Sequence, residues 1–368
     1  MNGADDLRTL ADLEAAARDR LDPARWSFVE GGAGDEVTLA ENRAAFRRWR
    51  LHPRVLTGGE PPSLATTVAG IPVTTPILVA PFAGDTHFHP DGFAAVLRAC
   101  AARGTLAVVP ELTTASLGEL AAEAPDAARI FQLSLLGTVE DFTRLAGRAE
   151  DAGYAALCVT VDAPVAGVRR RTTPARADSG LTLGNFEPVT LGNFGPDSGI
   201  DVTEYFGHVQ RLTRRDWSWA DLAAATATTG LPFIVKGILG AADARAAVDA
   251  GAAAVYVSNH GGRQLDAAPA TLDALEEVVA AVGGDAEVLL DGGIRSGTDV
   301  VMALALGARA VLIGRPAVMG LAAAGQAGVA RILEILDHEV LTTMTLLGRA
   351  AVRDLDRSVI RPAPGSTP

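Results

Sequence analysis

The chain of 368 residues is poor in cysteine, and its two cysteines lack the spacing of a metal site. We expect Cys100 and Cys158 to pack as small apolar side chains rather than to form a disulfide or a zinc site. Chains without a disulfide framework are typical of the reducing cytosol, so a cytoplasmic location is predicted.

Positive charge is also scarce. The chain has 44 acidic and 32 basic residues, a formal net charge of −12, and this argues against a nucleic-acid partner, which needs a basic face. No N-terminal apolar stretch resembles a signal peptide, and no run approaches the roughly 18 to 20 apolar residues of a membrane span. A soluble protein without a nucleic-acid or membrane partner is expected.

Instead, the chain contains short apolar runs that alternate with alanine-rich helical patterns. The predicted strands are Ile77–Ala80, Leu106–Val109, Ile130–Leu133, Ala156–Val161, Phe233–Lys236, Ala253–Ser258, Val288–Asp291 and Ala310–Ile313. The predicted helices are Asp91–Arg103, Ser116–Ala124, Thr138–Ala152, Ala241–Ala250, Thr271–Val282 and Gly297–Leu306. Eight such units predict an α/β fold, a closed (β/α)8 TIM barrel. An open doubly wound sheet is the alternative, but no GxGxxG turn follows an early strand.

The segments outside these units predict a single domain, residues 1–368, with additions to the barrel. We expect a helical N-terminal extension over 1–70, the barrel over 71–320 and C-terminal helices over 321–368. A long insertion at 165–228, after the fourth strand, is rich in Gly, Asn, Pro and Arg and is predicted to be a lid or a disordered loop.

The segment 257–266, which reads VSNHGGRQLD, ends the sixth predicted strand in a polar turn. Side chains at this end of a barrel strand face the open mouth, where TIM barrels have their active sites. His260 is suited to proton transfer near neutral pH, and Arg263 to binding a carboxylate or phosphate. Taken alone, the motif also fits a capped strand with a hydrogen-bonded core histidine.

Other strands end in polar residues too, and their convergence favours an active site over a structural ring of ion pairs. These residues are Gln132, Ser134, Thr160, Asp162, Lys236, Ser258, Asp291, Gly314 and Arg315. The glycines after Asp291 and the arginines Arg295 and Arg315 follow strands seven and eight, the usual phosphate site of this fold. Lys236 is suited to a Schiff base, a phosphate, an electron-rich ring, or a salt bridge to Asp162 or Asp291.

Together these residues resemble the FMN-dependent α-hydroxy-acid oxidase and dehydrogenase family, which includes glycolate, lactate and mandelate oxidases. The segments that carry the resemblance read SNHGGRQLD, TVDAP, VKG and DGGIRSGTDV, and it extends over nearly the whole chain. It implies FMN as cofactor, a small anionic substrate and a homo-oligomer, a tetramer in many family members. It also implies oxidation of a 2-hydroxy acid to a 2-oxo acid.

The resemblance assigns roles residue by residue. It makes His260 the base, Asp162 its carboxylate partner, Lys236 the cation at the flavin, and Arg263 and Arg169 the substrate-carboxylate ligands. The residues matched to FMN contacts are Ala80, Pro81, Ala83, Gln132, Thr160, Lys236, Ser258, Asp291, Gly293, Arg295, Gly314 and Arg315. No metal is implied.

Three positions depart from the family pattern, and all lie on the substrate side. Phe28 and Ser134 stand where the family normally has tyrosines, and Pro110-Glu111-Leu112 replaces small polar residues. A hydrogen bond to a charged group contributes about 1.5–3 kcal/mol, so losing two phenols weakens binding of a small acid. We therefore expect a substrate bulkier than glycolate or lactate. The alternatives are oxidation of an amine or another substrate that is not a hydroxy acid, and a flavin-binding protein without turnover.

Overall fold

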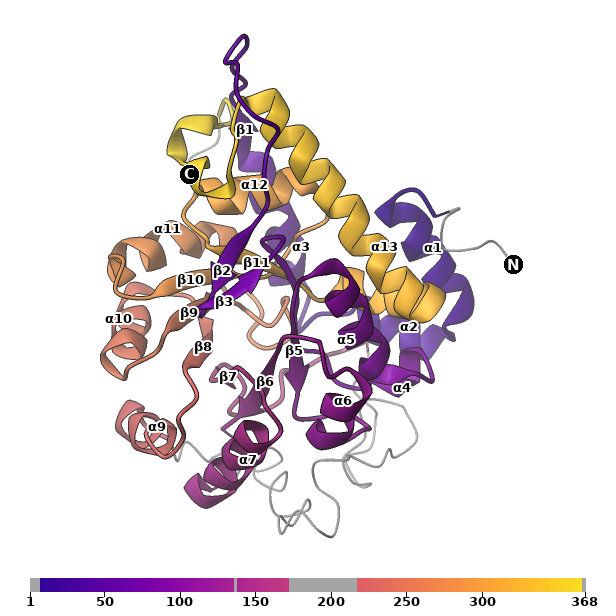
Figure 1. Cartoon of the computed structure of the whole chain (residues 1–368), viewed down its shortest axis with the longest axis vertical. Helices are drawn as coiled ribbons and strands as arrows, with labels where there is room; N and C mark the ends of the chain where they lie inside the picture. Colours follow the sequence, from indigo (N-terminus) through magenta and orange to yellow (C-terminus); the bar gives the residue numbers. More distant parts are fainter. Residues whose placement is uncertain (1–6, 136–137, 172–216, 366–368) are drawn as a thin grey trace.

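The computed structural model describes residues 7–135, 138–171 and 217–365, and eight parallel strands among them form a closed barrel (Figure 1). The barrel strands are β4 (Ile77–Val79), β5 (Ala107–Pro110), β6 (Arg129–Ser134), β7 (Ala156–Thr160), β8 (Phe233–Ile238), β9 (Ala254–Val257), β10 (Glu287–Leu290) and β11 (Ala310–Ile313). Closure occurs where β11 pairs with β4. The predicted TIM barrel is confirmed, and no strand boundary differs from the predicted one by more than two residues.

Alternate residues of the strands form two separate apolar layers. Leu78, Ile130 and Tyr256 belong to the cluster that fills the barrel, whereas Ile77 and Phe131 belong to the cluster between strands and helices. Both faces are therefore apolar, as a parallel sheet covered by helices requires. Cys100 and Cys158 are free and buried, which confirms the prediction that they pack as apolar side chains.

Helices surround the barrel, and several begin at a polar side chain that caps the first turn. Ser116, Thr138 and Ser218 each accept a hydrogen bond from the backbone three residues later and form capping boxes. The helices after the barrel strands are α5 (Gly92–Arg103), α6 (Leu117–Glu123), α7 (Val139–Asp151), α9 (Trp219–Thr226), α10 (Ala241–Asp249), α11 (Thr271–Val282), α12 (Gly297–Ala305) and α13 (Arg315–Leu347).

The predicted insertion at 165–228 is wrong at its end, because α9 occupies part of it. Ser218 caps this helix and its apolar face buries Leu222 and Ala225, so the last residues of the insertion belong to the barrel scaffold. The residues 172–216 of the predicted lid lie outside the described residues.

The N-terminal extension predicted over 1–70 is helical in its first part. It contains α1 (Leu10–Arg20), α2 (Pro23–Glu30) and α3 (Val37–Ala44), but also two strands of three residues each, and a third follows directly after it. β1 (Trp49–Leu51) pairs with β12 (Ile360–Pro362), and β2 (Thr66–Val68) with β3 (Ile71–Val73). Val68 and Val73 pack on the interior of the barrel, so this hairpin covers one of its ends. Strands this short carry too few residues to show a period.

The C-terminal region contains two helical stretches, joined by a kink and labelled together α13, followed by two short 3-10 helices. α13 begins at Arg315, directly after β11, and bends at Ala324 and Gly325, which have non-helical backbone angles. By length and composition it could cross a membrane, contrary to the expectation that no apolar run is long enough, yet 67% of its most apolar window is buried. It packs against α1, α5 and α12, as Figure 1 shows, which is how the core helix of a soluble fold behaves.

The N-terminal extension is fixed to the barrel through a buried pair of amides. Asn42 Nδ2 donates to Asn259 Oδ1, and Asn259 Nδ2 donates to Asn42 Oδ1, both at 2.8 Å. The Thr271 backbone N–H also donates to Asn42 Oδ1, at 3.2 Å. This arrangement joins α3 to the turn after β9 and to the start of α11.

We predict that Asn42→Ala lowers the free energy of unfolding by about 2–4 kcal/mol, because one N–H of the Asn259 amide and the Thr271 N–H lose their buried acceptor. Asn259 keeps its bonds to the Pro269 carbonyl and the Gly262 N–H. Urea unfolding of the purified protein measures the change. Asp19→Ala, an exposed position on α1, is the control and should change stability by less than about 0.5 kcal/mol. Equal stability of the two variants would contradict this account of how the extension is fixed.

Candidate functional site

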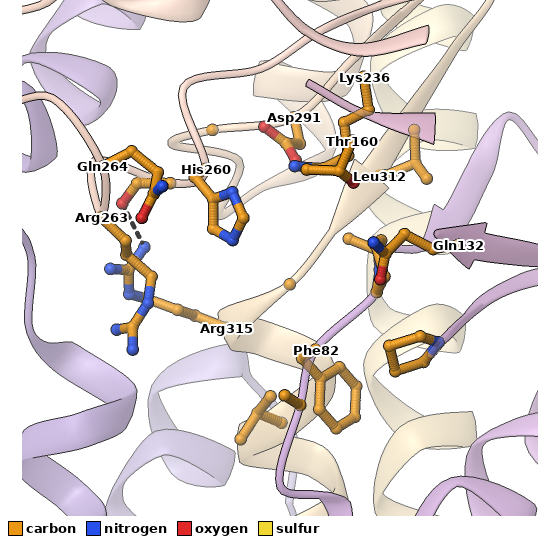
Figure 2. Close-up of a pocket in the computed structure, with 18 of the residues that line it drawn as sticks. Phe82, Gln132, Thr160, Lys236, His260, Arg263, Gln264, Asp291, Leu312 and Arg315 are labelled. Carbon is orange, nitrogen blue, oxygen red and sulfur yellow. Dashed lines mark hydrogen bonds between the residues drawn. The ribbon is translucent and has the colours of Figure 1, made fainter. Parts of the chain in front are cut away.

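A cavity of about 310 Å³ lies at the carboxyl ends of the barrel strands. Figure 2 shows the His260 ring near its middle, with Arg263 and Arg315 on one side and Gln132 on the other. Most of the predicted site residues line it. They are Phe28, Ala80, Pro81, Ala83, Gln132, Ser134, Thr160, Arg169, Lys236, His260, Arg263, Asp291, Gly293, Arg295, Gly314 and Arg315.

Two predicted site residues, Asp162 and Ser258, are not among those that line the cavity. Ser258 is fully buried, and its hydroxyl accepts the backbone N–H of His260 at 3.1 Å. That bond holds His260 in the left-handed region, at a φ of 60°. The predicted contact between Ser258 and the cofactor stays a prediction, and the structure adds a role for the hydroxyl in holding the turn that contains His260.

Asp162 lies behind His260 and orients it. Its Oδ1 and Oδ2 are 3.1 and 3.3 Å from His260 Nδ1. A carboxylate only accepts hydrogen bonds, so Nδ1 carries the proton and Nε2 of the neutral ring has a free lone pair. Burial by itself raises the pKa of Asp162, but the charges of His260 and Lys236 outweigh it and lower the pKa to about 2.

The imidazole is kept neutral at physiological pH. Burial lowers the pKa of His260, Asp162 raises it, and the charges of Lys236 and Arg169 lower it further, so that the net shift is downward. The side chain is 32% exposed and faces the cavity, whereas that of Asp162 is 12% exposed. A neutral ring with Nε2 free is the state that a proton acceptor needs.

Arg263 is fixed at the cavity wall by hydrogen bonds of Nη1, while its Nη2 has no partner among the described residues. Its Nη1 donates to the carbonyls of Phe28 (2.7 Å) and Gly31 (2.8 Å), and its guanidinium carbon lies 4.5 Å from the centre of the Phe28 ring. Among the described residues, the buried Nη2 has no hydrogen-bond partner. Burial and the charges of Arg169 and Arg315 lower the pKa of Arg263 well below its usual value, a strain that an anion would relieve.

Arg169 approaches the same cavity from the start of the insertion. Its Nε donates to the Arg263 carbonyl at 3.1 Å, and its Nη2 donates to Gln264 Oε1 at 3.2 Å. Gln264 Nε2 in turn donates to the carbonyls of Asp162 and Val165. Arg169 and Arg263 both line the cavity that His260 lines, an arrangement suited to binding a carboxylate.

Lys236 lies within β8, two residues before its end, and its side chain is buried, with 3% of the residue exposed. Among the described residues no ion pair joins it to Asp162 or Asp291, so the alternative of a structural salt bridge is wrong. Burial by itself lowers the pKa of Lys236, but the through-space attraction of Asp162 and Asp291 raises it. The ammonium is therefore charged and lies 5.5 Å from the centre of the Tyr256 ring.

Two further buried polar atoms without a hydrogen-bond partner among the described residues belong to the loop after β10. The Asp291 Oδ2 accepts from the Tyr256 hydroxyl at 2.8 Å, while the buried Oδ1 has no partner among the described residues. The same is true of Arg295 Nε. Burial, with the charge of Arg43, lowers the pKa of Arg295 to about 10.

Arg315 is more strongly tied to the protein than the sequence suggests. Its Nε, Nη1 and Nη2 donate to the carbonyls of Val29, Gly261 and Gly31 at 2.8, 2.9 and 2.8 Å. These bonds fix the loop after α2 and the turn after β9 to the barrel mouth. The role of Arg315 as a phosphate ligand stays a prediction, and the structure adds this positioning role.

The substrate side of the cavity combines one short polar side chain, Ser134, with several aromatic rings. Ser134 Oγ accepts from Gln132 Nε2 at 3.0 Å, and the Ser134 backbone N–H donates to Glu111 Oε1 at 3.1 Å. Phe82 and Phe88 form an aromatic wall with Phe28, with ring centres 6.2 Å apart for Phe28–Phe88 and 6.3 Å for Phe82–Phe88. Sequence reasoning missed Phe82 and Phe88, although both follow the first barrel strand closely.

Comparisons with known proteins agree with this geometry. The chain matches the model of the FMN-dependent dehydrogenase family over residues 17–362. It is 42% identical over 365 residues to 2-hydroxyacid oxidase 1 of Homo sapiens, covering 97% of both chains. It is 43% identical over 356 residues to L-lactate oxidase of a Nostoc species, covering 95% of this chain and 97% of the relative.

A solved structure of mandelate oxidase has a TM-score of 0.86 and 42% sequence identity, with 97% of this chain and 98% of that chain covered. The family resemblance read from the sequence is thereby confirmed. This chain belongs to the FMN-dependent dehydrogenase family.

Proposed function

We propose that this protein uses FMN to oxidise a 2-hydroxy acid, bulkier than glycolate or lactate, to the 2-oxo acid, with His260 as base. The observation that carries the proposal is the placement of three groups around one cavity. A neutral histidine backed by Asp162, an arginine nitrogen without a partner on Arg263, and the buried ammonium of Lys236 all face the same space.

The described residues fit FMN. The cofactor has a phosphate dianion, hydroxyl groups and an electron-poor ring, and the cavity offers a partner for each. Arg295 Nε is a buried donor near the phosphate loops, Asp291 Oδ1 is a buried acceptor suited to a hydroxyl, and Lys236 is a cation beside the ring site. Bound FMN supplies the two-electron acceptor.

The protein supplies the groups that move and stabilise the proton. His260 Nε2 takes a proton from the substrate, because Nδ1 already carries one and points to Asp162. The imidazolium that results is stabilised by the carboxylate, whose low pKa keeps it ionised throughout. Oxidation of the carbon that carries the hydroxyl to the 2-oxo acid releases two electrons and two protons: His260 takes one proton, and the electrons pass to bound FMN with the other.

Arg263 and Arg169 hold the substrate carboxylate. The Nη2 of Arg263 has no other partner among the described residues, and Arg169 is kept beside it by Gln264. Two arginines in one buried pocket repel each other unless an anion lies between them, and this favours an acid over an amine as substrate. Amine oxidation on the same FMN barrel is the second candidate.

The size of the substrate follows from Phe28 and Ser134. A serine leaves the volume of a tyrosine ring open next to Gln132, and Phe28 offers the carboxylate no hydroxyl because its ring lies against Arg263. The aromatic wall of Phe28, Phe82 and Phe88 suits an apolar or aromatic side chain on the substrate. A cytoplasmic homo-oligomer is proposed from the family resemblance and from the buried, free cysteines.

Anaerobic bleaching of the FMN absorbance tests this function. We expect aromatic 2-hydroxy acids such as mandelate or phenyllactate to reduce the flavin at least about tenfold faster, at low concentration, than glycolate or lactate. Ser134→Tyr fills the open volume, and we expect it to reverse that preference. Ser134→Ala is the matched control, because it removes the hydroxyl and keeps the space.

Reduction by amines that lack a carboxylate, with none by any 2-hydroxy acid, would favour the amine alternative. Efficient turnover of glycolate or lactate by the unmodified protein would contradict the predicted substrate size. A flavin that no substrate reduces would contradict both and indicate a binding protein without turnover.

The pH dependence of kcat/KM follows from the depressed pKa of His260. The base works when neutral, so activity rises as pH increases through this pKa, which lies below the usual 6.5, and is level at neutral pH. Lys236→Met removes a cation that lowers the pKa of His260, and we predict that the acidic limb moves to higher pH. Lys236→Arg keeps the charge and should leave the limb in place. An acidic limb that is the same in all three proteins would argue against His260 as the titrating base.

A further inference from the structure

Tyr256 is a buried titratable residue that the proposed proton transfer does not use. It lies in β9, is fully buried and belongs to the apolar cluster that fills the barrel. A hydroxyl group in an apolar interior is costly unless it has a hydrogen-bond partner, and buried tyrosines usually have one. The partner of Tyr256 is Asp291, which lines the cavity that contains His260.

The register of the barrel strands brings Tyr256 between two residues of the cofactor site. Tyr256 is paired with Lys236 of β8 on one side and with Leu289 of β10 on the other. Side chains alternate between the faces of a strand, so Asp291, two residues after Leu289, points to the same face as Leu289. That face is the barrel interior, where Leu289 packs with Tyr256. Lys236 and Asp291 both line the cavity (Figure 2).

The hydroxyl group of Tyr256 holds one oxygen of the Asp291 carboxylate, because it donates to Oδ2 at 2.8 Å. Burial and the charge of Asp291 raise the pKa of Tyr256 well above its usual value, so the hydroxyl stays protonated and remains a donor. The other oxygen, Oδ1, is buried without a hydrogen-bond partner among the described residues. The bond to Oδ2 therefore restricts rotation of the carboxylate and leaves Oδ1 available to a ligand.

The ring of the same tyrosine lies close to the Lys236 ammonium. Nζ is 5.5 Å from the ring centre, a distance at which a cation is attracted to the face of an aromatic ring. One side chain thus contacts both the cation proposed to lie beside the flavin ring and the carboxylate proposed to bind a cofactor hydroxyl. This double contact holds the phenol in place, so that its hydroxyl keeps its direction toward Asp291.

We propose that Tyr256 is a positioning residue of the FMN site, whose hydroxyl holds Asp291 so that Oδ1 accepts a hydrogen bond from a hydroxyl group of the ribityl chain. This role rests on the proposed use of FMN. In the FMN-free protein, water in the cavity can hydrate the carboxylate, whereas the bound cofactor excludes that water. The donor from Tyr256 therefore stabilises the loaded protein more than the FMN-free protein.

Titration of FMN into the FMN-free protein, followed by quenching of the flavin fluorescence, tests this role. Tyr256→Phe keeps the ring beside Lys236 and removes the hydroxyl alone, and we expect FMN binding to become about tenfold weaker. Tyr154→Phe is the matched control. It removes another buried hydroxyl, which donates to the Leu117 carbonyl at 3.1 Å and is outside the cavity lining, and it should leave the affinity unchanged.

A double-mutant cycle separates positioning from a general effect on the barrel. Asp291→Ala removes the group through which Tyr256 is proposed to act. Adding Tyr256→Phe to Asp291→Ala should therefore change the FMN affinity by less than about twofold, whereas a purely structural effect would give the same tenfold loss in both backgrounds.

An undiminished FMN affinity in Tyr256→Phe would overturn the proposal, and so would equal losses in the two backgrounds of the cycle. Either result would leave the proposed oxidation standing, because the unmodified protein would still bind FMN. Failure of the unmodified protein to bind FMN would overturn the proposed function, and the role of Tyr256 with it.

Discussion

Burial of positive charge around one cavity is the constraint on which the rest of the structure depends. Five cationic side chains, Arg169, Lys236, Arg263, Arg295 and Arg315, line the cavity, and Asp291 and Glu111 are the carboxylates among the lining residues. Uncompensated buried charges are costly, so the fold has to supply partners. It does so with backbone carbonyls for Arg263 and Arg315, and with through-space attraction to Asp162 and Asp291 for Lys236.

The scaffold is organised around these charges. The carbonyls of Val29 and Gly31, at the end of α2, reach the barrel mouth and accept from Arg263 and Arg315. The N-terminal extension is therefore part of the site, and the Asn42–Asn259 pair fixes it at a second point. The donors and acceptors without partners, on Arg263, Arg295 and Asp291, are what the protein leaves for anions and hydroxyl groups of its ligands.

The barrel and most of the site could be predicted from the sequence, because apolar strands that end in polar residues leave a strong pattern. The hairpin of β2 and β3 could not, since three-residue strands show no period. The three hydrogen bonds from Arg315 to backbone carbonyls could not be predicted either, because two of the acceptors, Val29 and Gly31, are far away in the sequence. The same holds for the hydrogen bond from the His260 backbone N–H to the Ser258 hydroxyl, because it depends on the conformation of the turn after β9.

The most direct test of the account is whether the phosphate of FMN neutralises these buried cations. Thermal unfolding of the FMN-free protein measures this, with FMN and riboflavin added separately at matched concentrations. We predict that FMN raises the Tm by several degrees and that riboflavin, which lacks the phosphate, raises it far less, because a ligand stabilises the folded state in proportion to its affinity. Equal shifts with the two flavins, or no shift with FMN, would contradict the account.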